Sequence, residues 1–149
     1  MENNISIELM TETDLAEVVL IGKNTRQLQI DDHKNMYYEP ESVAKAIKSP
    51  SEVCLVAKVN DQLAGFFIAH INEVFNEVYL SDMVLKPEYR GQGIGQMLIT
   101  KAREILKPKN IDWSWALVQD DNLPMHHFME KQGYIKGKKF YFFYKPSGF

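Results

Sequence analysis

Three glycines on alternate positions form the part of this sequence best suited to chemistry. They lie in the segment Arg90-Gly91-Gln92-Gly93-Ile94-Gly95-Gln96, which follows an apolar run that ends at Pro87. Glycine has no Cβ, so its backbone N–H can approach an anion closely. The first turn of a helix adds N–H groups that have no intrahelical acceptor. The segment therefore predicts a turn that binds a pyrophosphate through its backbone amides.

Two common phosphate-binding patterns do not fit this turn. A P-loop would end in Gly-Lys-Ser/Thr, and that ending is missing here. The dinucleotide pattern G-x-G-x-x-G needs a sixth-position glycine, but Gln96 stands there when the count starts at Gly91, and Leu98 when it starts at Gly93. A nucleotide-binding domain is therefore disfavoured. A turn without a ligand is disfavoured too, because glycines weaken the start of a helix.

The hydrophobic pattern predicts the elements that position the turn. Polar and apolar residues alternate as in half-buried strands, and elsewhere apolar residues recur at helical spacing. Stretches rich in Asn, Asp and Pro separate these segments and mark turns. Strands are expected at 5–9, 52–59, 63–71, 77–86, 111–118 and 139–144, and helices at about 13–22, 41–48, 94–106 and 124–132. This order predicts one α/β domain of the α+β type over residues 1–149.

Composition excludes several classes of function. The chain has 149 residues, a net charge of −3 and one cysteine, Cys54. The charge lacks the basic excess of a nucleic-acid binder, and a single cysteine cannot form an internal disulfide. No apolar stretch reaches the length of a membrane span, and the first residues do not resemble a signal peptide. We expect a cytoplasmic protein with no metal site, since no cluster has metal-ligand spacing.

Residues 84–96 resemble the cofactor motif of the GNAT acetyltransferases, whose pattern is Arg/Gln-x-x-Gly-x-Gly/Ala. Arg90, Gly93 and Gly95 stand at the motif positions. Downstream, Asn122 and the run from Phe128 to Tyr134 are similar to the family's second cofactor helix, which often ends Phe-Tyr-Glu-Lys-x-Gly-Phe. The resemblance covers roughly residues 77–135. Residues 79–83, Tyr-Leu-Ser-Asp-Met, more weakly resemble the diamine (spermidine- and thialysine-type) branch.

The resemblance implies a fold and a cofactor. The fold is a mixed sheet of six to seven strands with about four helices, in which the parallel strands 77–86 and 111–118 splay apart. The cofactor is acetyl-CoA, with its pantetheine arm in that opening and its pyrophosphate on the glycine turn. The implied cofactor-binding residues are Met83, Val84, Leu85, Arg90, Gly91, Gln92, Gly93, Ile94, Gly95, Gln96, Asn122, Phe128 and Met129.

The catalytic residues stay open at this point. The family often places a tyrosine acid where this chain has Met129, and a thioether cannot donate a proton. His126, its neighbour His127 and Tyr141 are the alternative acids, or the thiolate leaves unprotonated. For the base, the diamine branch has an acidic residue where Ser81 stands here. Asp82 follows, but strand alternation turns it to the opposite face unless a bulge re-aims it. Glu73 and Glu77, acting through water, are the alternative bases.

Two functions remain open at this stage. The first is an acetyl-CoA-dependent N-acetyltransferase, in which a primary amine attacks the thioester directly within a ternary complex. The second is a cofactor-binding sensor or scaffold that lost its acid at Met129. The acceptor is a small-molecule or protein amine, and carboxylates at Asp31 and Asp32 would favour a cationic one. The aromatic segment 139–144 makes a homodimer conceivable, because an edge strand offers unpaired backbone groups.

Overall fold

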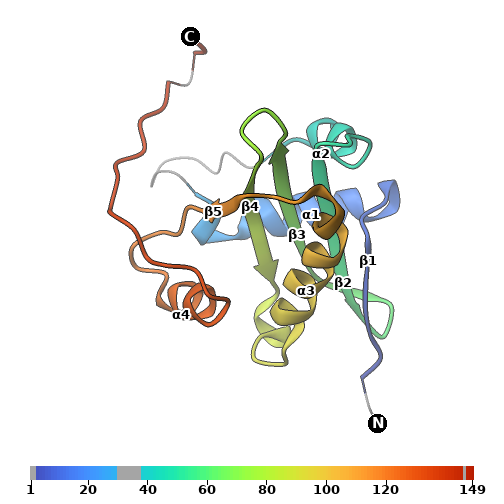
Figure 1. The fold of residues 1–149 in the computed structure, drawn as a ribbon. Coiled ribbons are helices and arrows are strands. Elements are labelled where there is room, and N and C mark those ends of the chain that lie inside the picture. The colour runs from blue at the N-terminus through green and yellow to red at the C-terminus, as the bar shows by residue number, and fades with distance from the viewer. Residues whose placement is uncertain (1–2, 30–37, 146) are drawn as a thin grey trace.

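The computed structural model describes residues 3–29, 38–145 and 147–149. A single mixed sheet carries strands in the order β1-β2-β3-β4-β5, with helices on both of its faces (Figure 1). The strands are β1 (Ile5–Leu9), β2 (Glu52–Val59), β3 (Gln62–Asn72), β4 (Glu77–Leu85) and β5 (Trp113–Ala116). The helices are α1 (Leu15–Asn24), α2 (Pro40–Ala46), α3 (Ile94–Leu106) and α4 (Leu123–Lys131), with a short 3₁₀ turn, η2 (Arg26–Leu28), after α1.

Strands β1 to β4 form an antiparallel meander, and β5 pairs with β4 in parallel. The β2–β3 hairpin turns at Asn60 and Asp61, whose φ angles are 50° and 65°. Two consecutive positive φ angles are typical of the tight hairpin turn that suits the twist of the flanking strands, and Asn and Asp tolerate them. The turn expected between the strands at 52–59 and 63–71 is therefore confirmed.

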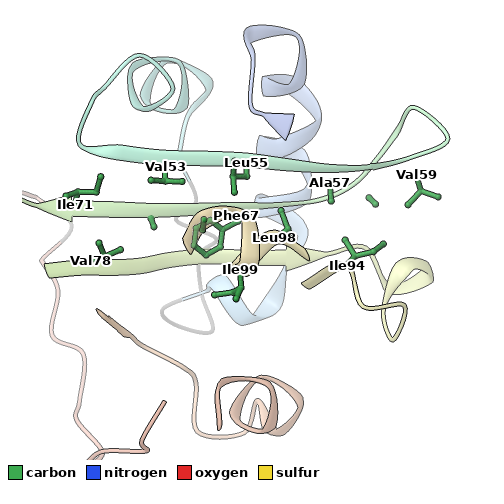
Figure 2. Close-up of a cluster of buried hydrophobic side chains, with 13 residues drawn as sticks. Val53, Leu55, Ala57, Val59, Phe67, Ile71, Val78, Ile94, Leu98 and Ile99 are labelled. Atoms are coloured by element: carbon green, nitrogen blue, oxygen red, sulfur yellow. The ribbon is translucent and has the colours of Figure 1, made fainter. Parts of the chain in front are cut away.

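Each face of the sheet buries its own apolar cluster. On one face, Val53, Leu55 and Phe67 pack against Leu98 and Ile99 of α3 (Figure 2). On the other face, a second cluster joins the sheet to α1 and α2; it includes Val18, Val19, Val43, Val56, Phe66 and Ile68. The strands in the centre of the sheet are therefore buried on both sides, which explains why β2 and β3 are continuous apolar runs rather than alternating ones.

The strand count differs from the expectation. The described residues form five strands rather than six to seven, and the predicted strand at 139–144 is not among them. That segment lies extended and exposed, and Phe140, Tyr141 and Phe143 are more than 80% accessible. Aromatic residues favour strands, but a strand forms only where a neighbouring backbone supplies its hydrogen bonds.

No described helix is long and apolar enough to span a bilayer.

The pairing between strands β4 and β5 ends about halfway along β4. Their pairing runs from Glu77–Trp113 to Leu80–Ala116 and ends there, while β4 continues to Leu85. The backbone of β4 beyond Leu80 therefore has no β5 partner on that side. An opening of this kind leaves N–H and C=O groups available to an extended ligand.

Candidate active site

The predicted glycine turn joins β4 to α3. After the 3₁₀ turn Pro87–Tyr89, Gly91 and Gly93 adopt left-handed φ angles of 73° and 79°. An added Cβ at either glycine would meet no heavy atom within 4 Å. The glycines are therefore required by their backbone conformation rather than by crowding. The space in front of the turn is open to a ligand.

Helix α3 begins without a capping side chain. Gly93 occupies its N-cap, and no side chain bonds to the first turn. The amides of Ile94, Gly95 and Gln96 therefore have no acceptor within the helix. An anion at this end would be stabilised by those amides and by the helix dipole.

Two predicted cofactor side chains lie folded back onto the turn. Arg90 Nε donates to the Leu85 carbonyl over 3.1 Å, and Gln92 Nε2 donates to the Glu88 carbonyl over 3.0 Å. In this arrangement they brace the loop, and the backbone amides are left to face the open space. Sequence reasoning had assigned both residues to the cofactor and did not foresee this bracing role.

Helix α4 packs directly on the start of α3. A Cβ at Gly95 would lie 3.4 Å from the Phe128 ring, an ordinary van der Waals distance, so α4 lies directly against the first turn of α3. Asn122 caps α4 and accepts a hydrogen bond from the Met125 amide. Met129 is buried on the same helix. The two predicted cofactor segments, far apart in sequence, thus lie side by side.

A small cavity of about 60 Å³ sits where β4 and β5 separate. Strand β4, the segment after β5, helix α4 and η2 all line it. The lining residues are Gln27, Leu28, Leu80, Ser81, Asp82, Met83, Ala116, Leu117, Val118, Gln119, Asn122, Met125 and Met129.

Several of these lining residues carried no functional signal in the sequence. Gln27 and Leu28 lie where the hydrophobic pattern fades, and their place at the cavity depends on a contact with chain more than fifty residues away. Gln119 fixes part of that contact, since its Nε2 donates to the Gln29 carbonyl over 2.7 Å.

A bulge at Ser81 decides where Asp82 points. Ala69 pairs with Leu80 and Ile68 pairs with Asp82, which leaves Ser81 without an opposite residue. The extra residue reverses the alternation, so Asp82 shares a face with Ile68 and the α1–α2 side. The sequence analysis named a bulge as the condition for re-aiming Asp82, and the structure contains it.

Burial makes the Asp82 carboxylate more basic than an ordinary one. Its side chain is 7% exposed, and this burial raises its pKa to about 6. The hydrogen bond from Ser81 opposes the rise, and the charge of Glu52 adds to it. Ser81 Oγ lies 3.0 Å from Asp82 Oδ2 and 3.1 Å from the Ile68 carbonyl, so its single proton is shared between two acceptors. Near neutral pH the carboxylate can take a proton.

A polar and aromatic row crosses four strands beside Asp82. Glu52, His70, Tyr79 and Trp115 are cross-strand partners in register. His70 Nδ1 lies 2.6 Å from Glu52 Oε1, and the rings of Tyr79 and Trp115 stack with centroids 4.3 Å apart. The pKa of the Tyr79 hydroxyl is raised by burial and then by the charge of Asp82. We define these four residues as the transverse row.

Tyr38 belongs to the same neighbourhood. Its pKa is raised by burial first, then by Asp82, Tyr79 and Glu52. A tyrosine that responds to all three groups lies within the electrostatic field of the row. Asp31 and Asp32, which were expected to favour a cationic acceptor, lie outside the described residues.

The two alternative acids, His126 and Tyr141, lie in different surroundings. His126 Nε2 lies 2.9 Å from the Gln119 carbonyl, so the histidine binds the segment that lines the cavity. Tyr141 is 91% exposed on the C-terminal segment and does not line the cavity. Met129, which the sequence resemblance aligns with a tyrosine of the family, lines the cavity.

The fold and this geometry define a class: an α/β domain with a glycine turn at an uncapped helix start, beside a parallel strand pair that separates and a buried carboxylate. The chain belongs to the GNAT family of acetyltransferases, whose family model matches residues 23–134.

Named relatives and solved structures agree with this assignment. The chain is 33% identical over 91 residues to the ribosomal protein bS18-alanine N-acetyltransferase of Haemophilus influenzae, covering 60% of each chain. It is 44% identical over 45 residues to thialysine N-ε-acetyltransferase of Bos taurus, covering 30% of this chain and 26% of that one. The chain thus spans three fifths or less of these curated relatives. A solved aminoglycoside N-acetyltransferase in complex with CoA matches with a TM-score of 0.78 and 16% identity, covering 98% and 97% of the two chains; this likeness concerns the fold.

Proposed function

We propose that this chain is an N-acetyltransferase that moves an acetyl group from acetyl-CoA to a primary amine by direct attack in a ternary complex. Family membership supports the reaction class. One observation carries the proposal for this chain: the Ser81 bulge turns a buried carboxylate toward the point where β4 and β5 separate. A basic group is thereby placed beside the opening that suits the acyl donor.

The residues present fit acetyl-CoA. The amides from Gly91 to Gln96 and the uncapped start of α3 suit the pyrophosphate. The backbone of β4 at Met83, Val84 and Leu85 has no β5 partner and suits the amide groups of the pantetheine arm. Residues Asn122, Phe128 and Met129 of the α4 region border the same opening from the other side.

Asp82 is the proposed general base. A free alkylammonium has a pKa near ~10 and no lone pair to attack with, so it must lose a proton first. The buried Asp82 carboxylate, with a pKa raised to about 6, takes that proton more readily than an exposed aspartate would. The amine nitrogen then bonds to the thioester carbon, and a backbone N–H near Met83 or Val84 stabilises the oxyanion. The nitrogen is now positively charged, and it releases its second proton to water as the carbon–sulfur bond breaks.

The leaving group departs as a thiolate. When the carbon–sulfur bond breaks, the electron pair goes to sulfur. Met129 cannot supply a proton there, and His126 already bonds to the Gln119 carbonyl. A thiol has an unperturbed pKa of roughly 8.5, so its thiolate is an acceptable leaving group near neutral pH without an acid.

The proposed acceptor is a small cationic amine. Glu52 and Asp82 bring negative charge to the sheet face beside the cavity, and Tyr38, Tyr79 and Trp115 bring aromatic rings. Carboxylates and ring faces both attract ammonium groups. The named relatives act on an alanine of a ribosomal protein and on thialysine, and this surface favours the second kind of acceptor.

Binding without turnover is the second candidate, because Met129 stands where the family often has its acid. One assay tests both functions: release of CoA thiol from acetyl-CoA in the presence of polyamines, thialysine-like amino acids, aminoglycosides or peptides with a free N-terminal alanine. Gly93→Asp, which places a negative charge in the pyrophosphate site, is the binding-deficient control.

Three results are informative. Turnover with cationic amines that disappears in Gly93→Asp and falls strongly in Asp82→Asn supports the enzyme and its base. Turnover confined to peptides would overturn the cationic-amine acceptor. Saturable acetyl-CoA binding with no turnover on any acceptor would favour the sensor.

A further inference from the structure

Trp115 carries a buried hydrogen-bond donor that has no acceptor in the part of the chain that the structure describes. Its indole Nε1 is shielded from solvent, and no described residue lies within hydrogen-bond distance of it in a suitable geometry. Buried polar groups in native proteins are almost always paired, because an unpaired donor loses its bonds to water and gains none in return. An orphaned donor beside a candidate active site therefore points to a partner that binds there.

The ionisable pair of the transverse row is satisfied, in contrast to the indole. At the β2–β3 end of the row, His70 Nδ1 and Glu52 Oε1 lie 2.6 Å apart. At the β5 end, the rings of Tyr79 and Trp115 stack with centroids 4.3 Å apart. Stacking covers the apolar face of the indole, but its N–H lies in the plane of the ring and still needs an acceptor. The unmet hydrogen-bonding capacity of the row is therefore at Trp115.

Trp115 lies close to the point where β4 and β5 separate. Its register partner is Tyr79, and the next pair, Leu80 with Ala116, ends the parallel ladder and lines the cavity. Asp82 lies on the same face of the sheet, three residues beyond Tyr79. At about 3.3 Å per residue and about 4.8 Å per strand, the backbone positions of Asp82 and Trp115 are roughly 10 Å apart. A molecule of amino-acid size can bridge their two side chains.

The chemistry of the indole N–H restricts what it can bind. It is a donor only, and an ammonium group is also a donor only, so the two cannot pair with each other. A simple polyamine therefore leaves Trp115 unsatisfied even when one of its amines lies at Asp82. The partner must carry a lone pair, which a carboxylate, carbonyl or hydroxyl oxygen supplies.

We propose that Trp115 is a specificity-determining residue, whose Nε1–H donates a hydrogen bond to an oxygen of the acceptor while the acceptor's amine lies at Asp82. The acceptor is then an amine that also bears an oxygen, as a basic amino acid or an amino sugar does, and not a simple polyamine. The inference rests on the proposed acetyl transfer for the amine at Asp82. The oxygen contact itself requires binding only, so it can be tested without turnover.

The first test is an NMR titration that observes the indole N–H directly. The chain has two tryptophans, and the other one, Trp113, is 59% exposed on β5. Trp113→Phe, labelled with nitrogen-15, therefore shows the indole signal of Trp115 alone. Lysine and its decarboxylated counterpart, pentane-1,5-diamine, are compared in the presence of CoA, which has no acetyl group to transfer. An aminoglycoside adds an amine that bears hydroxyl groups instead of a carboxylate.

Lysine or the aminoglycoside should move the Trp115 signal downfield in a saturable way and slow its exchange with solvent, whereas the diamine should do neither. The one that does so identifies the oxygen as carboxylate or hydroxyl. A diamine that changes the signal equally would overturn the proposal. An unchanged signal with both oxygen-bearing amines, up to their solubility limits, would overturn it as well and assign the donor to an ordered water.

The second test measures selectivity on the active protein. Trp115→Phe keeps an aromatic ring that can stack on Tyr79 but has no N–H. It should lower the ratio of kcat/KM for the oxygen-bearing amine to kcat/KM for the diamine about tenfold, mainly through KM. Trp113→Phe, the matched control on the same strand, should leave this ratio unchanged. A wild-type chain that prefers the diamine, or an unchanged ratio in Trp115→Phe, would leave Trp115 with a packing role only.

The two tests keep this inference apart from the proposed function. A response of the Trp115 signal without turnover on any amine would contradict acetyl transfer and leave the oxygen contact in place. Turnover with no response and no change of selectivity would support acetyl transfer and reject the role of Trp115. The NMR titration uses native Trp115, so it remains decisive even if Trp115→Phe does not fold.

Discussion

Asp14 and Asp82 are both buried carboxylates, each 7% exposed, yet their surroundings differ. Asp14 lies 3.2 Å from the Lys58 ammonium and accepts the Thr11 backbone N–H over 2.8 Å. Asp82 has the Ser81 hydroxyl and the nearby negative charge of Glu52. Removing one partner of a buried ion pair is costly, so Asp14 has a structural role, whereas a buried carboxylate without a cation suggests a function.

Asp82→Asn should therefore stabilise the protein while it removes activity. The folded-state pKa of about 6 lies above the unfolded value of 3.8, so the folded protein holds the Asp82 proton more tightly than the unfolded chain does. The stabilisation from this proton is fully present below about pH 4 and is lost as the pH rises through 6. The ionised carboxylate thus costs up to about 3 kcal/mol at pH 8, and asparagine should recover about 1–3 kcal/mol of unfolding free energy there. Turnover should fall roughly 10²–10⁴-fold. Urea titration at pH 8 and at pH 4, where the gain should vanish, measures the first effect.

Asp14→Asn is the matched control, because it changes an equally buried carboxylate away from the cavity. It should lower the unfolding free energy by about 1–3 kcal/mol through loss of its charged partners, with turnover intact. Equal stabilisation by both substitutions would contradict the assigned difference between the two sites.

The pH dependence of turnover should carry the same signature. Because Asp82 must be ionised to accept a proton, kcat should rise with pH through about 6 and level off above it. The rising limb should persist in His126→Asn and vanish in Asp82→Asn; the reverse pattern would transfer the role to the histidine.

At the scale of elements, Gly65 allows strands β3 and β4 to approach each other closely. A Cβ at Gly65 would lie 2.2 Å from the Val84 carbonyl oxygen and 2.6 Å from Leu85 Cδ2. Backbone cannot move aside cheaply, so Gly65→Ala should destabilise the protein by about 3 kcal/mol or more and displace the strand that is proposed to hold the pantetheine arm. Gly137→Ala, where the added Cβ meets nothing within 4 Å, should change stability little. Paired urea titrations make the comparison, and a neutral Gly65→Ala would argue against this strand geometry.

Local signals account for the elements that the sequence predicted well. The Asn60–Asp61 turn requires positive φ angles at two positions, and α3 has apolar residues at helical spacing after its glycines. Both signals are contained within a few residues. The element types, their order and the parallel partner of β4 followed from such signals and from the family resemblance.

The errors arise where one segment depends on another. Residues 139–144 have strand composition but no strand partner in the described chain. The direction of Asp82 depends on one unpaired residue in β4, and composition is the same with or without that bulge. Gln27 and Leu28 reach the cavity only because α1 packs against the sheet. The spacing of residues along the sequence does not predict these contacts between distant segments.

Over the whole molecule, the two faces of the sheet differ. The transverse row and Asp82 lie on the face covered by α1 and α2, while a groove of about 410 Å³ between α3 and β5 opens on the α3 face. Strand β5 borders both regions. A substitution in β5 can therefore affect the site and this groove together.

For the whole domain, acetyl-CoA binding can be measured separately from turnover, because a bound ligand raises the unfolding free energy. Acetyl-CoA at about 100 times its dissociation constant should add about 2.7 kcal/mol of unfolding free energy. For a domain of this size that amounts to a rise of roughly 5–11 °C in Tm. Gly93→Asp should abolish the rise because its carboxylate repels the pyrophosphate at the start of α3, whereas Asp82→Asn should keep it because that side chain acts on the acceptor.

The thermal shift and the turnover of Asp82→Asn together identify the role of Asp82. A full thermal shift with strongly reduced turnover in Asp82→Asn assigns the carboxylate to proton transfer. Loss of the shift in the same variant would make Asp82 part of the cofactor site. Differential scanning fluorimetry and thiol release on the same preparations give both readouts, and Asp14→Asn, which lies outside the cavity, should show a normal shift from a lower starting Tm.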